Sequence, residues 1–482
     1  MIFEIIRKYW VLVSLILILC TMMVGCTQDQ EGGDVDNDMN LEVSSNNYSV
    51  TNIELNGNQA TVNGSGAVMK ENNLVIQSSG VYEIAGELTN GRIMIDSSDT
   101  NEVTIRLNGV RISNQNGAAF VEKSSAGVVL LLAEETTNYF ENTNSSQADT
   151  NDEDTNEENL ESQGGILCKN NLTIEGTGDL EVYSKTGDGI KSKGVLSVVT
   201  GSIKVESLEH GLTGNDGMQI LGGTIEISCE KDGLHSKETI EFANADLNIK
   251  ASNEGIEAKK IWIKSGNIIL NAKDDGLNAA ADSQSQNTQV SQSDQPMDQP
   301  MERPMGGGDS QSNSECEIVF DGGTIAIYAD GDGIDSNGSV EMNGGTVSVY
   351  GPTTNGNGAL DYGIEFTMNG GTMIAMGSSG MMQSISDTSK QYGITQVFGE
   401  GEDSIQKGDI IKIQDGNETI LEIVAQKETA AIVLSTPELE DGKEYVIVVG
   451  DKQYKVTAQK DVVNHSMEGG MRPQRREAVA DF

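Results

Sequence analysis

Short runs of alternating apolar and polar residues recur along the middle of the chain. Two examples are Ile-Glu-Ile at 225–227 and Val-Ser-Val at 347–349, and each directly follows the phrase Gly-Gly-Thr. Alternation over so few residues is typical of half-buried β-strands, and glycines allow sharp corners between them. The phrase Gly-Gly-Thr occurs at 222–224, 322–324, 344–346 and 370–372.

A second phrase repeats out of phase with the first: an acidic residue, glycine, then isoleucine or leucine. Its successive glycines are 22, 22, 22, 21 and 57 residues apart. The longest interval contains a low-complexity segment near 281–314, and without these 34 residues the interval is 23. The repeat glycines are Gly189, Gly211, Gly233, Gly255, Gly276 and Gly333.

Short strands, glycine corners and a period near 22 residues describe the coils of a solenoid. Leucine-rich repeats have a similar period but need a leucine–asparagine consensus that this chain lacks, and calcium-binding nonapeptide repeats are shorter. We therefore expect an all-β fold, a right-handed single-stranded parallel β-helix with coils stacked about 4.8 Å apart.

Composition and turn signals divide the rest of the chain. The β-helix is predicted over 41–393, with irregular first coils and with inserts, expected to be disordered, near 141–163 and 281–314. Strands joined by Asp-Gly and Gly-Asp turns predict a small antiparallel β module over 394–460. A flexible tail is expected over 461–482.

The amino terminus has the pattern of a secretory signal. Basic residues precede an apolar run, and Gly25 directly before Cys26 resembles a bacterial lipobox. This pattern predicts a signal peptide over 1–25, lipidation of Cys26 and an acidic tether over 26–40. The alternative is an uncleaved transmembrane anchor. Both place the remaining chain outside the membrane, and the first predicts a lipid anchor on the outer face of the bacterial cell membrane.

Charge and cysteine usage narrow the class of partner. The chain has 31 basic and 74 acidic residues, a net charge of −43. Binding to nucleic acid needs a clustered basic surface, so we exclude nucleic acid as a partner, whereas an acidic surface favours solubility and cation binding. Cys168, Cys229 and Cys316 are far apart and outside any CxxC motif, so we expect them to be buried core residues.

Stacking turns each repeat position into a row in space. The residues just before the repeat glycine are Asp188, His210, Asp232, Glu254, Asp275 and Asp332. The residues two positions after it are Lys191, Thr213, His235, Glu257, Asn278 and Asp335. Like charges directly opposite each other destabilise a sheet, so something must offset the acids. Early coils contain lysines for this purpose, and late coils do not.

In the late coils both rows carry oxygen ligands, which suit calcium because it takes 6–8 oxygens. Magnesium prefers a smaller octahedral site, and a transition metal would need more histidine or cysteine. The alternative is that the acids accept hydrogen bonds from backbone amides of the turn. The candidate calcium ligands are Glu254, Glu257, Asp274, Asp275, Asn278, Asp332 and Asp335.

Candidate sugar contacts lie beside the acidic rows. Trp262 alternates with isoleucines that should point inward, so its ring should face outward, where it can stack on a sugar or be covered by a loop. The lysines form either a solvated charge ladder or, with calcium, a groove for an anionic sugar chain. These lysines are Lys191, Lys193, Lys237 and Lys259.

Several of these phrases together resemble a clostridial family of cell-surface carbohydrate-binding β-helix proteins, over roughly 41–460. The matching segments are 254–258, 274–280, 331–338, 351–353, 357–362 and 377–381. The resemblance implies a pectate-lyase-like fold, calcium binding by the carboxylates above, and recognition of cellulose-like and acidic polysaccharides such as polygalacturonate. His210 departs from the acidic row, which argues against a metal on that coil.

Three functions remain open. The first is a monomeric, non-catalytic, calcium-binding protein that binds polysaccharides. The second is a calcium-dependent polysaccharide lyase, in which Lys237 or Lys259 would remove the proton alpha to a uronate carboxylate. The third is a surface adhesin without a sugar ligand. We expect the first, with no catalytic residue.

Overall fold

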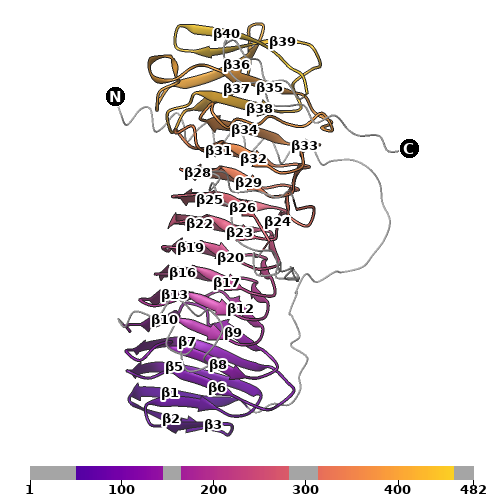
Figure 1. Ribbon diagram of the computed structural model, residues 1–482. Coiled ribbons are helices and arrows are strands. Elements are labelled where there is room, and N and C mark those ends of the chain that lie inside the picture. The colour runs from indigo at the N-terminus through magenta and orange to yellow at the C-terminus, as the bar shows by residue number, and fades with distance from the viewer. Residues whose placement is uncertain (1–49, 145–163, 282–312, 461–482) are drawn as a thin grey trace, which may run out of the picture. The chain divides into compact units, whose positions relative to one another are not determined.

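The computed structural model of the protein describes residues 50–144, 164–281 and 313–460 (Figure 1). The predicted signal peptide, the lipidation site Cys26, the tether, the tail and most of both inserts lie outside the described residues. In the described ranges, no helix is long and apolar enough to cross a membrane.

The described residues form a parallel β-solenoid in which each coil contributes three short strands (Figure 1). One strand of each coil belongs to a 12-stranded sheet, and the other two belong to a 24-stranded sheet that covers two further faces. The all-β parallel fold expected from the repeat is therefore confirmed, with equivalent strands of successive coils hydrogen-bonded in register.

The strands of the 12-stranded sheet are β3 (Ala67–Lys70), β4 (Asn73–Ile76), β6 (Ile93–Asp96), β8 (Phe120–Ser124), β11 (Ile166–Cys168), β14 (Ile190–Ser192), β17 (Leu212–Gly214), β20 (Leu234–His235), β23 (Ile256–Ala258), β26 (Leu277–Ala279), β29 (Ile334–Ser336) and β32 (Leu360–Tyr362). The second face comprises β9 (Val128–Leu132), β12 (Leu172–Gly176), β15 (Leu196–Val198), β18 (Met218–Ile220), β21 (Thr239–Phe242), β24 (Lys260–Ile263), β27 (Glu317–Phe320), β30 (Ser339–Met342) and β33 (Phe366–Met368). The third face comprises β1 (Thr51–Gly57), β2 (Gln59–Asn63), β5 (Gly80–Thr89), β7 (Val103–Asn114), β10 (Thr137–Asn142), β13 (Asp179–Ser184), β16 (Ser202–Ser207), β19 (Thr224–Ser228), β22 (Ala245–Ser252), β25 (Gly266–Ala272), β28 (Thr324–Ala329), β31 (Thr346–Tyr350) and β34 (Thr372–Gly377).

The first coils end in antiparallel hairpins, β1 with β2 and β3 with β4. Beyond them the coils stack in parallel, and β5 and β7 contain bulges, in agreement with the expected irregularity. Strand β10 extends to Asn142, which is buried and donates hydrogen bonds to Thr186 and Gly164. The first two residues of the predicted insert at 141–163 therefore belong to the solenoid.

One continuous apolar core fills the solenoid, because alternate strand residues point inward. Cys168, Cys229 and Cys316 are buried with free thiols, which confirms that they are core residues. The repeat glycines are sterically required. A Cβ atom on Gly276 would lie 2.2 Å from Ile327 Cγ2 and 2.5 Å from the Gly333 carbonyl oxygen. Only glycine lets the turn pack this closely on the next coil.

The predicted carboxy-terminal module is a four-stranded antiparallel sheet of β37 (Glu418–Val424), β36 (Ile410–Asp415), β39 (Glu444–Val449) and β40 (Lys452–Thr457). One predicted member lies elsewhere. Strand β38 (Ala431–Ser435) pairs antiparallel with β34 and with β35 (Gly393–Val397). All five residues of β38 are buried, so this apolar strand covers the last edge of the solenoid, which would otherwise be open. A short 3-10 helix, η2 (Gly401–Asp403), precedes the module.

Candidate functional site

Two rows of polar side chains follow the turn and strand positions of the 12-stranded sheet. Strand pairing confirms that equivalent repeat positions stack in register across β14, β17, β20, β23, β26, β29 and β32. The outer row, on these strands, consists of Lys191, Thr213, His235, Glu257, Asn278, Asp335 and Asp361. The turn row, just before these strands, consists of Asp188, His210, Asp232, Glu254, Asp275 and Asp332.

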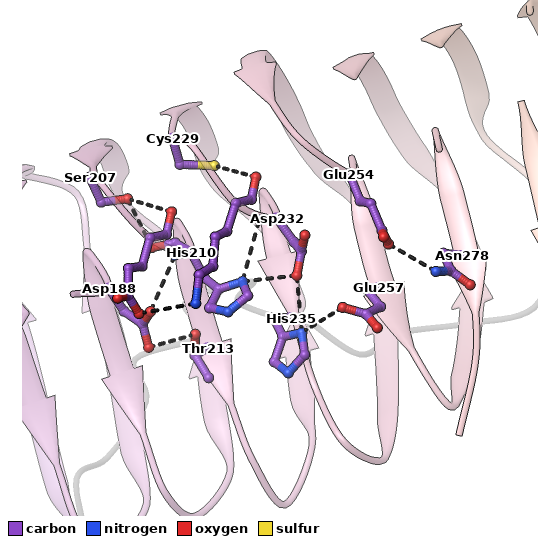
Figure 2. Close-up of polar contacts among 12 residues, drawn as sticks. Asp188, Ser207, His210, Thr213, Cys229, Asp232, His235, Glu254, Glu257 and Asn278 are labelled. Carbon is purple, nitrogen blue, oxygen red and sulfur yellow. Dashed lines mark hydrogen bonds and ion pairs between the residues drawn. The ribbon is translucent and has the colours of Figure 1, made fainter. Parts of the chain in front are cut away.

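The two rows interact diagonally: a turn-row residue contacts the outer-row residue of the following coil (Figure 2). Thr213 donates a hydrogen bond to Asp188 Oδ2 at 3.1 Å, and the Asn278 amide donates to Glu254 Oε2 at 2.9 Å. The residue pairs that meet are therefore 24 or 25 positions apart in the chain, one coil plus a short offset.

In the early coils the acid is neutralised by the fold. The buried Asp188 carboxylate lies 3.0 Å from Lys191 Nζ and accepts a hydrogen bond of 3.2 Å from the backbone amide of His210. Burial alone would raise the pKa of Asp188, but Lys191 and His210 outweigh it and lower that pKa below its usual range. Asp188 therefore stays ionised without an added cation.

In the middle coils two histidines hold one buried carboxylate (Figure 2). Asp232 Oδ2 lies 2.9 Å from His210 Nδ1 and 3.2 Å from His235 Nδ1, and His235 Nδ1 is also 3.0 Å from Glu257 Oε2. Burial lowers the pKa of His235, but hydrogen bonds to Asp232 and Glu257 outweigh it and raise that pKa to about 9. The histidines lower the pKa of Asp232 in turn, against its burial.

In the late coils the acids have no such partner in the described part of the chain. Oxygens of Asp275, Asp332 and Asp335 lie within 4.8 Å of one another. Burial, aided by the neighbouring carboxylates, raises the pKa of Asp275 and Asp335 to about 7 and that of Asp332 to about 6. Backbone amides of Asp332 and Gly358 donate to one oxygen each of Asp275 and Asp332, as in the backbone-bonding alternative.

The neighbouring coil supplies an unmet acceptor. Asn278 Oδ1 is buried and has no hydrogen-bond partner within the described ranges, since its amide nitrogen is used by Glu254. Burial and the nearby Glu257 raise the pKa of Glu254 to about 8. A buried carbonyl oxygen without a donor costs about 1–3 kcal/mol, and a hard cation would satisfy it. The donor set thus fits calcium.

Asp274 lies beside this group. A Cβ atom built on Gly331 would lie 2.4 Å from Asp274 Oδ1 and 2.5 Å from Asp275 Oδ1, so both carboxylates lean over that glycine. Asp330, in contrast, turns away, because its carboxylate pairs with Lys427 Nζ at 2.7 Å.

The predicted lysines are spread along the turns. Lys191 pairs with Asp188, while Lys193 and Lys237 follow β14 and β20. Lys259 Nζ lies 2.6 Å from Glu315 Oε2, and this hydrogen bond raises the pKa of Lys259.

Trp262 is separated from both rows because it lies on β24, in the 24-stranded sheet. Its side chain is 39% exposed between buried isoleucines, as the alternation predicted. Its indole Nε1 donates to Asp321 Oδ2 at 2.6 Å, and Lys264 Nζ lies 3.9 Å from the ring centroid. A hollow of about 520 Å³ beside the ring is lined by Glu241, Lys260, Trp262, Glu317, Asp321 and Asn343, among others.

Sequence reasoning missed three participants. Asp361 continues the outer row and accepts a hydrogen bond of 2.6 Å from Gln383, and extension of that repeat position by one coil would have found it. His210 and His235 form a stacked pair, with ring centroids 4.4 Å apart. The signal was their spacing of 25 residues, the same as between Asp188 and Thr213.

Comparison with known proteins shows likeness to carbohydrate-binding proteins. A "Carbohydrate-binding domain-containing protein" of Acetivibrio thermocellus is 28% identical over 145 residues, which are 30% of this chain and 49% of that protein. The chain thus spans about half the length of this curated relative. A solved "polysaccharide lyase-like protein" from C. thermocellum, a gadolinium derivative, is 21% identical with a TM-score of 0.39, over 62% of this chain and 94% of that one.

A family model described as "Carbohydrate-binding domain-containing protein" matches residues 70–356, more than half of the chain. The match contains both polar rows from Asp188 to Asp335 and the hollow beside Trp262. This protein therefore belongs to the family of carbohydrate-binding domain-containing proteins.

Proposed function

We propose that this chain is a monomeric, calcium-binding and non-catalytic protein of the bacterial cell surface that binds plant-type polysaccharides. Membership of a carbohydrate-binding family supports the ligand class. The cation, the sugar and the surface location are proposals, argued below from the described residues and from the amino-terminal sequence.

The hollow beside Trp262 is the observation that carries the sugar-binding part. An indole face packs well against the C–H face of a hexose ring, and the surrounding carboxylates, lysine and amide can hydrogen-bond to sugar hydroxyls. Asp321 and Lys264 already fix the ring, so little side-chain entropy is lost on binding. Three acids, Glu241, Glu317 and Asp321, border the hollow, which favours a neutral, cellulose-like chain there.

Acidic chains would bind through calcium in the late coils. Asp275, Asp332 and Asp335, with Asn278 nearby, offer oxygen ligands, and a bound ion would offset their mutual repulsion. A chain with net charge −43 repels polygalacturonate unless a cation bridges the two. Calcium shared between these carboxylates and a uronate would supply that bridge.

The lyase alternative needs a lysine that is neutral at working pH. Lys259 is a poor candidate because its bond to Glu315 raises its pKa, which holds its proton more tightly. Binding without cleavage is therefore the function that these residues support better. Surface display rests on the lipobox-like sequence before Cys26, and removal of the Cys26 thiol by Cys26→Ser should release the protein from the membrane fraction.

Sugar binding is tested by replacing the exposed ring. Trp262→Ala should weaken binding to soluble cello-oligosaccharides at least about tenfold, measured by calorimetry, because a buried Trp contact is commonly worth 2 kcal/mol or more. Leu208→Ala is the matched control, since Leu208 is also an exposed apolar side chain, 55% exposed. Unchanged affinity in Trp262→Ala would rule out this hollow as the neutral-sugar site.

A polygalacturonate assay with calcium separates the three functions. We expect calcium-dependent binding without any increase in the ultraviolet absorbance of unsaturated products. Product absorbance would establish the lyase instead, and failure to bind a panel of plant polysaccharides with calcium present would favour the adhesin.

A further inference from the structure

The middle coils contain a cluster that differs in ligand chemistry from the acidic late coils. The whole chain has three histidines, and two of them, His210 and His235, meet on one carboxylate, Asp232. Both rings make these contacts through Nδ1, so two imidazole nitrogens and a carboxylate oxygen converge at one point (Figure 2). The three ligand atoms lie within 4.8 Å of one another.

We propose that His210, Asp232 and His235 form a binding site for a borderline divalent metal ion such as Zn²⁺. Imidazole nitrogen suits zinc, copper and nickel, whereas calcium prefers oxygen ligands only. The two kinds of site would thus lie on the same face of the solenoid and select different ions.

Distances within the cluster are close to those of a tetrahedral site. Ligands about 2.0–2.2 Å from zinc at tetrahedral angles are themselves roughly 3.3 Å apart. The nitrogen–oxygen separations here are 2.9 Å for His210 and 3.2 Å for His235. Since the rings stack at 28°, coordination requires both imidazoles to rotate toward the ion, which then replaces the protons shared in these contacts.

Burial and charge also suit an ion that enters from solvent. Asp232 forms the base at 6% exposure, while the His210 and His235 side chains are 15% and 23% exposed. Glu257 Oε2, 3.0 Å from His235 Nδ1, is placed to act as a fourth ligand. Two carboxylates and two neutral imidazoles would balance the double charge of the ion.

The test is a Zn²⁺ titration of the full secreted chain without a polyhistidine tag, stripped with EDTA and held in excess calcium to occupy the hard oxygen ligands. We expect one Zn²⁺ per chain by calorimetry. His210→Ala and His235→Ala should each weaken binding at least about tenfold, a change of about 1.4 kcal/mol. His465→Ala, which removes the third histidine, and Asp335→Asn should leave zinc affinity unchanged.

A second readout separates ligation from misfolding. Co²⁺ bound by the wild type should show visible ligand-field absorption that is lost in both histidine variants, while their calcium titrations stay normal. The proposal is overturned if the wild type binds no more Zn²⁺ than the His210→Ala variant, or if binding disappears with His465 instead. Sugar binding at Trp262 does not enter either experiment, so this outcome is independent of the proposed function.

Discussion

The middle and late coils share one backbone repeat yet treat their acids in opposite ways. The pKa of Asp232 is lowered because two histidines outweigh the effect of its burial, whereas the pKa of Asp335 is raised to about 7 by burial and by neighbouring acids. Strand register is the same in both regions. The charge state of each acid therefore depends on the residue one coil further along, and the late coils depend on a cation from solution.

The largest expected effect comes from breaking the internal balance of the middle coils. Asp232→Asn leaves the raised positive charge of His235 with Glu257 alone, and we expect a loss of about 3 kcal/mol in the free energy of unfolding. Denaturant unfolding measures it. Asp246→Asn, in an exposed pair with Asn267, is the control and should change little. A loss below about 0.5 kcal/mol in Asp232→Asn, as for an ordinary surface site, would refute the contrast.

The next effect comes from transferring the early pattern to the late coils. Asn278→Lys places an ammonium where Lys191 stands in the early coils, so it should occupy the acids and weaken calcium binding at least about tenfold. Gln219→Lys, an exposed site on β18, is the matched control for added charge. Equal calcium affinity in both variants would place the ion elsewhere.

The pH dependence of stability should sharpen the same contrast. Folding raises the pKa of Glu254 to about 8 and that of Asp275 to about 7, above the unfolded values near 4. The folded state binds more protons, so this stabilisation is full below about pH 4 and is lost as the pH rises toward 8. In EDTA the melting temperature should fall across that range, and calcium should remove most of the fall. A flat EDTA profile would contradict the raised pKa values.

The smallest effect is expected in the early coils. Lys191→Met removes an ion pair, but Asp188 keeps hydrogen bonds from His210 and Thr213, so we expect a cost of about 1 kcal/mol. Lys204→Met, in an exposed pair with Glu206, should cost less. Thermal unfolding compares the two, and a larger loss for Lys204 would reverse the assigned order.

The fold was predictable because the repeat glycines and alternating strands are local signals. Steric contact at Gly276 explains why that glycine recurs with a fixed period. Strand β38 was assigned to the wrong sheet, since an apolar run of five residues does not reveal which edge it covers.

The late acidic cluster was predictable from repeat position, because stacking brings Asp275, Asp332 and Asp335 together. The histidine pair was missed because repeat positions were compared within rows, and the contacts run diagonally between rows. The partner of Trp262, Asp321, is 59 residues away across an insert, and no periodicity in the sequence indicates it.

Asp335→Asn tests the central claim most directly, by calorimetric melting at pH 8 with and without calcium. Without calcium the substitution should raise the melting temperature, since it removes an uncompensated buried charge; with calcium it should reduce the stabilisation that the ion gives to the wild type. A lower melting temperature in EDTA, together with a full calcium-induced increase, would contradict the account.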